Sequence, residues 1–224
     1  MPVQSHSMFD SPLITALLIL FLVLLCWYLL GMQYNIRRER RALRWMENGL
    51  PIIGEKAALD WSGVSHVEIQ VPKAKEPFRS ADVVIDLVPR EIPLWWFWRK
   101  NVPTQDTIIV RAQLRTAPRF DLVSHSPHVP ADEQLKRSGT GQWTAVQGGL
   151  ANAMSADIRG NISPYTVNRL IVQTTLEGMT LTRLIVHRSA PNLEVHYLLP
   201  QFEQVSSLRV FTGIHQLGEE VAQV

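Results

Sequence analysis

The chain of 224 residues has a single cysteine, Cys26, and lacks the short motifs of several common enzyme classes. One cysteine excludes an intramolecular disulfide, which suits a domain in a reducing compartment. The sequence contains no Gly-x-Ser-x-Gly, no His-Glu-x-x-His, and no phosphate loop with a Lys and a Ser or Thr after its last glycine. These absences favour a non-enzymatic protein without a cofactor, and they leave an enzyme of another type open.

Charged side chains are also few, at 19% of the residues, and the deficit has a local cause. Residues 13–31, "LITALLILFLVLLCWYLLG", carry no charge. A helix of roughly 20 apolar residues spans a hydrocarbon core of about 30 Å. Trp27 and Tyr28 lie near the end of the run, where aromatic belt residues occur. The run therefore predicts a transmembrane helix, and a buried core helix of a soluble protein is the alternative.

The first twelve residues contain no Lys or Arg, and no small-x-small cleavage site follows the apolar run, which argues against a cleaved signal peptide. Lys and Arg near a span stay on the cytoplasmic side. We therefore expect residues 1–12 outside, residues 32–224 in the cytoplasm, and the protein in the cell membrane, or in an endomembrane such as the ER if the source is eukaryotic. Five arginines follow the span and are predicted to contact anionic lipid headgroups: Arg37, Arg38, Arg40, Arg41 and Arg44.

Residues 32–50 predict a basic helix beside the membrane, because they contain good helix formers and end at Gly49 and Pro51. Residues 51–224 then predict an α+β domain that is rich in strands, with two halves separated by a polar loop near 125–142. Alternating apolar residues predict strands in "SHVEIQV", "ADVVIDLVP", "DTIIVRAQL", "RFDLVSH", "TLTRLIVHR" and "NLEVHYLLP". Ser163 and Pro164 predict the start of a helix, and residues 201–221 predict a C-terminal helix packed on the sheet.

An aromatic cluster lies between two predicted strands, in "IPLWWFWRK". The run is too short to cross a bilayer. Trp beside cationic side chains is typical of a membrane interface, and packing in the core or a surface that binds another protein are the alternatives. Consecutive residues cannot all face one way on a helix or a strand, so two of these interpretations can hold together. The candidate foot or interface consists of Trp95, Trp96, Phe97, Trp98, Arg99 and Lys100.

Other candidate sites carry weaker signals. His125 and His128 are the best metal candidates, with Asp132 and Glu133 nearby, but their spacing is loose, no fourth ligand stands out, and a solvated loop explains them better. The paired glycines 148 and 149 fit a simple turn better than an anion site. Because the ligand set is incomplete, we predict no metal. The formal net charge of +2 does not point to a nucleic acid, so we predict no nucleic-acid partner.

The order of features in residues 13–115 resembles the coiled-coil-domain-containing subunit of the PAT complex. The likeness rests on the apolar run, Gly31 and Asn35, the basic helix with Trp45, and "ENGLPIIGE" with Gly54, followed by the strands around the aromatic cluster. That family is a single-span partner of the translocon that helps multipass membrane proteins fold. This chain departs from it in a shorter linking helix, in the aromatic cluster, and in the missing charged coiled-coil tail, which puts a ribosome-contacting role in doubt.

Together these features predict a single-pass membrane protein that acts as an interaction or scaffold subunit. We expect membrane lipids and other membrane proteins as partners, and the resemblance implies a role in membrane-protein assembly. The rival hypothesis is a membrane-tethered enzyme or ligand-binding domain that acts on a lipid or on a membrane-associated substrate. A polar pocket lined by titrating residues would favour this rival.

Overall fold

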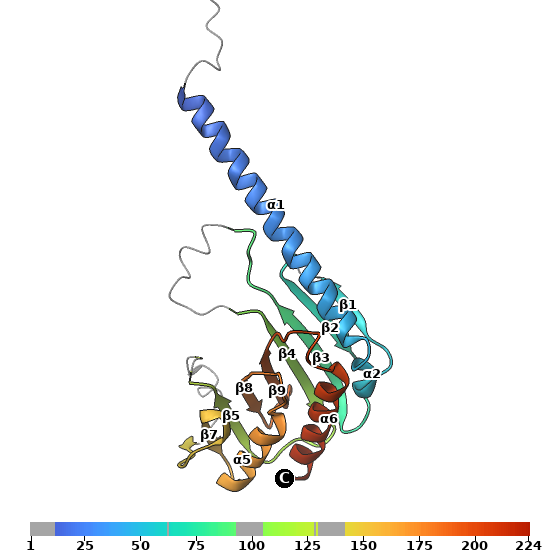
Figure 1. The fold of residues 1–224 in the computed structure, drawn as a ribbon. Helices are drawn as coiled ribbons and strands as arrows, with labels where there is room; N and C mark the ends of the chain where they lie inside the picture. The colour runs from blue at the N-terminus through green and yellow to red at the C-terminus, as the bar shows by residue number, and fades with distance from the viewer. Residues whose placement is uncertain (1–11, 62, 93–104, 128, 130–141) are drawn as a thin grey trace, which may run out of the picture.

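The computed structural model describes residues 12–61, 63–92, 105–127, 129 and 142–224. These residues form an N-terminal helix, a large antiparallel sheet and a C-terminal helix, which confirms the predicted α+β class (Figure 1). The helices are α1 (Pro12–Met46), α2 (Leu50–Ile53), α5 (Pro164–Thr174) and α6 (Ser207–Gln223), with a 3-10 turn at Ala151–Ala153. The strands are β1 (Ala58–Trp61), β2 (His66–Val71), β3 (Phe78–Asp86), β4 (Thr107–Leu114), β5 (Asp121–His125), β6 (Thr144–Ala145), β7 (Ser155–Arg159), β8 (Leu181–Val186) and β9 (Leu193–Leu198).

The strands make one sheet in the order β1-β2-β3-β4-β9-β8-β5-β7-β6, and each neighbouring pair is antiparallel. The sheet is continuous across the division that we predicted near residues 125–142, because β4 pairs with β9 and β5 lies between β8 and β7. The six predicted strands are all present, whereas β1, β6 and β7 were not among them. These three strands are short or lack a clear alternation of buried and exposed residues, so they carry little periodic signal.

One face of the sheet is apolar and packs against helices. Alternate residues of each strand point to opposite faces, and Val110 of β4 and Val195 of β9 are paired and fully buried on the helix side. Tyr197 confirms the direction, because its hydroxyl donates to the carbonyl of Thr174 in α5 at 2.8 Å. α5 begins as predicted, with the Ser163 side chain accepting from the backbone N–H of Thr166. α6 begins six residues later than predicted, because turns precede it.

α1 is one continuous helix of 35 residues that joins the predicted span to the predicted basic helix. It ends at Met46, earlier than predicted, and Pro51 lies in the first turn of α2. Figure 1 shows α1 projecting away from the domain, with only its C-terminal part against the sheet and the other helices. Trp45 anchors that part, since its Nε1 donates to the carbonyl of Val205 at 2.5 Å and its ring lies against Phe202 and Phe211.

Replacing Trp45 with Ala should destabilise the domain, because the change removes this hydrogen bond and the ring contacts that hold α1 on α6. The expected loss is about 3 kcal/mol, as for other large-to-small core changes. Thermal unfolding of the full-length protein in detergent micelles measures it. Trp61→Ala is the matched control, because Trp61 is 49% exposed on the edge strand β1 and should change stability by less than about 0.5 kcal/mol. Equal effects of the two variants would contradict the assignment.

Candidate functional site

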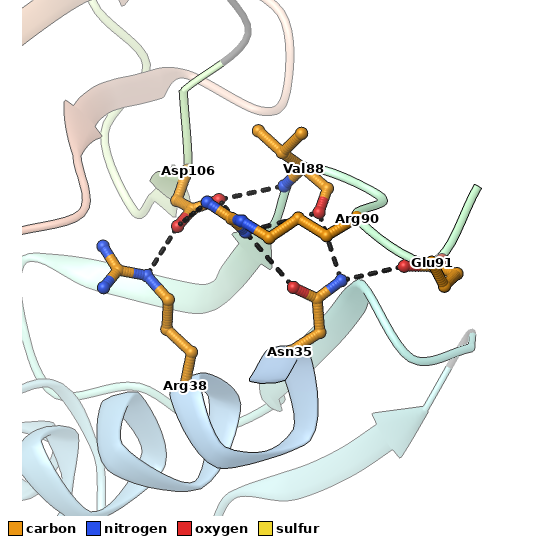
Figure 2. A network of polar contacts seen from close by, with 6 residues as sticks. All are labelled: Asn35, Arg38, Val88, Arg90, Glu91 and Asp106. Atoms are coloured by element: carbon orange, nitrogen blue, oxygen red, sulfur yellow. Dashed lines mark hydrogen bonds and ion pairs between the residues drawn. The ribbon is translucent and has the colours of Figure 1, made fainter. Parts of the chain in front are cut away.

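A polar network joins α1 to the segment that follows β3 and to the residue that precedes β4. Figure 2 shows its members, which we call the junction network: Asn35, Arg38, Val88, Arg90, Glu91 and Asp106. Asn35 and Arg38 lie on α1, Val88 to Glu91 lie after β3, and Asp106 immediately precedes β4. The network therefore connects segments that are more than fifty residues apart in the chain.

Asp106 is the centre of the network. Its side chain is 4% exposed and accepts hydrogen bonds from the backbone N–H of Val88 at 2.9 Å and from the two terminal nitrogens of Arg90 at 2.9 and 3.1 Å. Arg38 approaches the same carboxylate from α1, with 2.5 Å between its Nε and Oδ2. Hydrogen bonds between charged groups are about twice as strong as neutral ones. One carboxylate thus pairs with two arginines that come from different elements.

Asn35 satisfies the backbone and side chains of the segment after β3. Its Nδ2 donates to the carbonyl of Val88 at 3.1 Å and to Oε2 of Glu91 at 3.0 Å. Its Oδ1 accepts from Arg90 at 3.2 Å. The side chain is fully buried, and a buried amide without partners would be costly. Asn35 therefore lies on a packed face of α1 although it is polar, because it connects this helix to the segment after β3.

The last turn of the apolar run lies against Arg90. The indole N–H of Trp27 donates to the Arg90 carbonyl at 3.1 Å, and the Arg90 guanidinium lies 4.9 Å from the centre of the Tyr34 ring. A Cβ on Gly31 would lie 2.6 Å from the Arg90 carbonyl oxygen, so only glycine permits this approach. The segment around Arg90 is thereby held at the level of the C-terminal end of the apolar run.

Glu39 is the unusual member of the same helix face. It is 1% exposed, and neither carboxylate oxygen has a hydrogen-bond partner. Burial, and secondly the negative charge of Glu91, raise the pKa of Glu39 to about 7. Arg38 and Arg90 are both committed to Asp106, so neither compensates for Glu39. The folded protein therefore holds Glu39 as a neutral acid over part of the range near neutrality.

The five predicted arginines do not act as one cluster. Arg38 is partly buried and paired with Asp106. The other four are exposed, and the spacing i, i+3, i+4, i+7 places them on the face of α1 that points away from the domain. The Nε of Arg44 donates to the carbonyl of Arg40, an interaction within the helix. The signal that separates Arg38 is its position one turn after Asn35, on the side of the helix that packs on the sheet.

The remaining predicted site residues are only partly described. The aromatic cluster, Trp95 to Lys100, lies outside the described residues, and so do His128, Asp132 and Glu133. His125 lies at the end of β5, where its Nδ1 is 3.4 Å from the carbonyl oxygen of Ser126. Within the ranges that the structure describes, no group of three or more His, Cys, Asp or Glu could hold a metal ion.

Asp106→Asn should loosen the junction, because Arg38 and Arg90 would lose their shared anion. Removing one partner of a buried ion pair costs about 3–5 kcal/mol, and we expect about 2–3 kcal/mol because the arginine side chains are partly exposed. Their side chains are each 29% exposed. Thermal unfolding of the full chain in detergent tests this prediction. Asp86→Asn, at the exposed end of β3, is the control and should leave the midpoint nearly unchanged.

Glu39 makes stability depend on pH in a defined direction. Because its folded pKa of about 7 exceeds the ordinary value of 4.5, the folded state keeps a proton that the unfolded chain loses. The resulting stabilisation is complete below about pH 4.5 and is lost as the pH rises to about 7, at no more than about 1.4 kcal/mol per pH unit. Glu39→Gln mimics the neutral acid and should lose this dependence.

The measurement compares thermal midpoints of wild type and Glu39→Gln at several pH values. The thermal midpoint of Glu39→Gln should exceed that of wild type by a difference that grows as the pH rises toward 7 and stays constant above it. Glu47→Gln, an exposed change just beyond the end of α1, should run parallel to wild type. Parallel curves for Glu39→Gln as well would show that Glu39 already ionises normally in the folded protein.

Comparison with models of known protein families finds no match, and comparison with curated proteins finds no significant match. The resemblance to the PAT-complex subunit therefore stays a prediction.

Proposed function

We propose that this protein is a single-pass membrane protein whose domain is held at the membrane surface and binds other membrane proteins there without catalysing a reaction. The observation that carries the proposal is the contact of Arg90 with Trp27 and Gly31, because it ties the domain to the end of the apolar run. Each step of the proposal follows from this contact and from the surroundings of α1.

The apolar part of α1 needs an apolar solvent. α1 is the helix, among the described residues, that is long and apolar enough to cross a membrane, and its most apolar stretch is not buried by the rest of the chain. Its large apolar side chains from Leu17 to Leu30 are exposed. Burying apolar surface gains about 25 cal/mol per Å², so a bilayer around this stretch is strongly favoured over water. Because α1 is continuous, the junction network would lie directly beyond the surface of the membrane.

The connection between β3 and β4 would then begin and end at the membrane surface. Its first described part reaches Ile92, which is 44% exposed two residues after Arg90, and its last part returns at Asp106. The aromatic cluster, residues 95–100, belongs to this connection. Trp and Arg are typical of the headgroup zone. The anchoring of both ends supports a role for this connection as the surface that meets lipids and partner proteins.

Of the four exposed arginines on α1, only the first would reach the lipids. Arg37 lies six residues beyond Gly31, or about 9 Å along the helix, and Arg44 lies about 20 Å beyond it. The headgroup zone is about 5–7 Å thick on each side, and salt screens charges over about 8 Å. We therefore assign lipid contact to Arg37. Arg40, Arg41 and Arg44 contribute to the cationic flank that would keep the domain in the cytoplasm.

A rigid junction is what a scaffold at a membrane requires. Asn35, Arg38 and Gly31 fix the direction of α1 relative to the sheet, so the domain would present one surface to its neighbours at a constant height. The resemblance to the PAT-complex subunit agrees with this, and it adds assembly of multipass proteins as the process. The junction network does not place a nucleophilic side chain beside a base, which is consistent with a binding role.

Site-specific photocrosslinking in native membranes tests the proposal. A photoreactive amino acid in place of Ile92 should give discrete adducts that mass spectrometry identifies as integral membrane proteins. The same group in place of Tyr165, which is 76% exposed on α5 away from the junction, should not give these adducts. Adducts with lipid alone at position 92 would contradict a protein-binding role. Protease added to the cytoplasmic side should digest the domain in the same membranes, and protection of the domain would contradict the orientation.

A further inference from the structure

Four exposed arginines lie along one face of α1, and we call them the arginine stripe: Arg37, Arg40, Arg41 and Arg44. An α-helix has about 3.6 residues per turn, so these positions are centred opposite the face that buries Asn35 and Glu39. At about 1.5 Å per residue the stripe is about 10 Å long. It therefore forms a continuous cationic surface that the domain does not cover.

The stripe has no compensating carboxylate in the described part of the chain. No side chain of the stripe forms an ion pair there, and the polar contact of Arg44 is with the carbonyl of Arg40 in the same helix. Glu39 lies between Arg37 and Arg40 in the sequence, but it is buried on the opposite face of α1. Glu47 is exposed just beyond the helix and does not pair with Arg44.

Arginines elsewhere on the surface of the domain are treated differently. Arg111, Arg115 and Arg169 are each about half exposed, and each forms an ion pair with a carboxylate. The domain thus has acidic partners for surface arginines on its strands and on α5. The unpaired state of the stripe is a local property of α1.

The guanidinium groups of the stripe repel one another. Arg37 is three residues from Arg40 and four from Arg41, and Arg44 is three and four residues from the same two. Side chains at these spacings are neighbours on a helix, where like charges are destabilising. A preference for the cytoplasm requires cations near the span, but it does not require them on one face. The alignment is explained if anions from outside the chain face it.

The position of the stripe restricts where those anions come from. The stripe begins about 9 Å beyond Gly31 and ends about 20 Å beyond it, so most of it lies past the headgroups of a bilayer around the apolar run. α1 is continuous through both regions. A polypeptide that leaves the bilayer beside the apolar part of α1 would pass Arg37 first and Arg44 last. This position favours the juxtamembrane segment of a neighbouring membrane protein.

Carboxylates match the stripe in geometry as well as in charge. A guanidinium is planar and binds a carboxylate through two parallel hydrogen bonds. Glu or Asp residues three and four apart on a partner helix are about 5–6 Å from one another, which is the spacing within the stripe. A nucleic acid fits less well, because the chain without these four arginines has a formal net charge of −2, since the whole carries +2.

We propose that the arginine stripe binds an acidic juxtamembrane segment, rich in Glu or Asp, of a neighbouring membrane protein. This inference rests on the proposed function, because it names the chemistry of the partner that the domain meets at the membrane surface. Binding supplies a carboxylate to each unpaired guanidinium and removes the repulsion within the stripe. α1 thereby contributes a contact surface of its own beyond the apolar run.

Photocrosslinking in phosphatidylcholine liposomes tests the proposal. The full-length protein carries a photoreactive amino acid in place of Gln33, which is exposed one turn before Arg37. The probe is a synthetic peptide with one apolar span and a following helix that has Glu at every third or fourth position. The same peptide with Gln in place of Glu should give an adduct yield about tenfold lower, the factor expected for one charge-assisted hydrogen bond. Salt at about 1 M should remove this preference, because it screens charges beyond about 3 Å.

Charge-matched variants separate the stripe from the net charge of the protein. Arg40→Gln, Arg41→Gln and Arg44→Gln together should lower the adduct yield about tenfold, and lysine at these positions should retain it because the charge remains. The thermal midpoint should not fall in the glutamine variant, because no ion pair is lost. The matched control combines changes at three exposed arginines outside α1 and should behave as wild type: Arg79→Gln, Arg119→Gln and Arg209→Gln.

Dependence of the adduct on both Glu in the probe and arginine in the stripe supports the proposal. Equal adducts with the Glu and Gln peptides, equal loss in the stripe and control variants, or loss in the lysine variant would overturn it. Stripe-dependent binding of double-stranded RNA in a mobility-shift assay, without a peptide adduct, would overturn it as well. If only this inference is wrong, crosslinks from position 92 to membrane proteins persist in native membranes, whereas their absence contradicts the proposed function itself.

Discussion

The junction depends on one ion cluster, in which the Asp106 carboxylate pairs with both Arg38 and Arg90. A buried anion with a single partner is often no better than an apolar residue, because desolvation offsets the attraction. Asp106 also accepts the N–H of Val88, so most of its hydrogen-bonding capacity is used inside the protein. Because the two arginines come from α1 and from the segment after β3, the cluster sets both the position and the rotation of the helix. Trp45 provides a second contact, with Phe211 of α6, and two separated contacts together fix the direction of α1.

The same junction also contains a destabilising group, the buried carboxyl of Glu39. Glu39 lies on the packed face of α1 with no partner for its carboxylate, and Glu91 adds repulsion. A neutral residue at this position would be more stable near neutral pH, so the carboxyl weakens the region that the ion cluster strengthens. Buried ionisable groups of this kind are common where a protein responds to a partner or to pH. The conflict lies one helical turn from Asn35, at the point where the domain meets the apolar helix.

The two faces of the sheet have different chemistry. The helix side is a continuous apolar core, in which residues of all the central strands pack against α5 and α6. The opposite side carries Arg111, Arg183, Glu194 and His196, and they form a charged band across β4, β9 and β8. A sheet whose second face is not covered by any of the described helices can present a binding surface without losing its core. A pocket of about 400 Å³, whose lining includes Arg183 and His196, lies in this band.

The amino-acid sequence by itself determined the elements that depend on local pattern. The uncharged run of residues 13–31 predicts a long apolar helix, alternation predicts the six principal strands, and Ser163 predicts the start of α5, since each of these depends on neighbours within a few residues. Only the tertiary structure decided which residues act together. Arg38 differs from the other four arginines because of Asp106, which is 68 positions away, and the row of His125, Arg183 and His196 exists only through the pairing of β5, β8 and β9. Periodicity shows that a strand forms and which side is apolar, but it contains no information on which strand lies beside it.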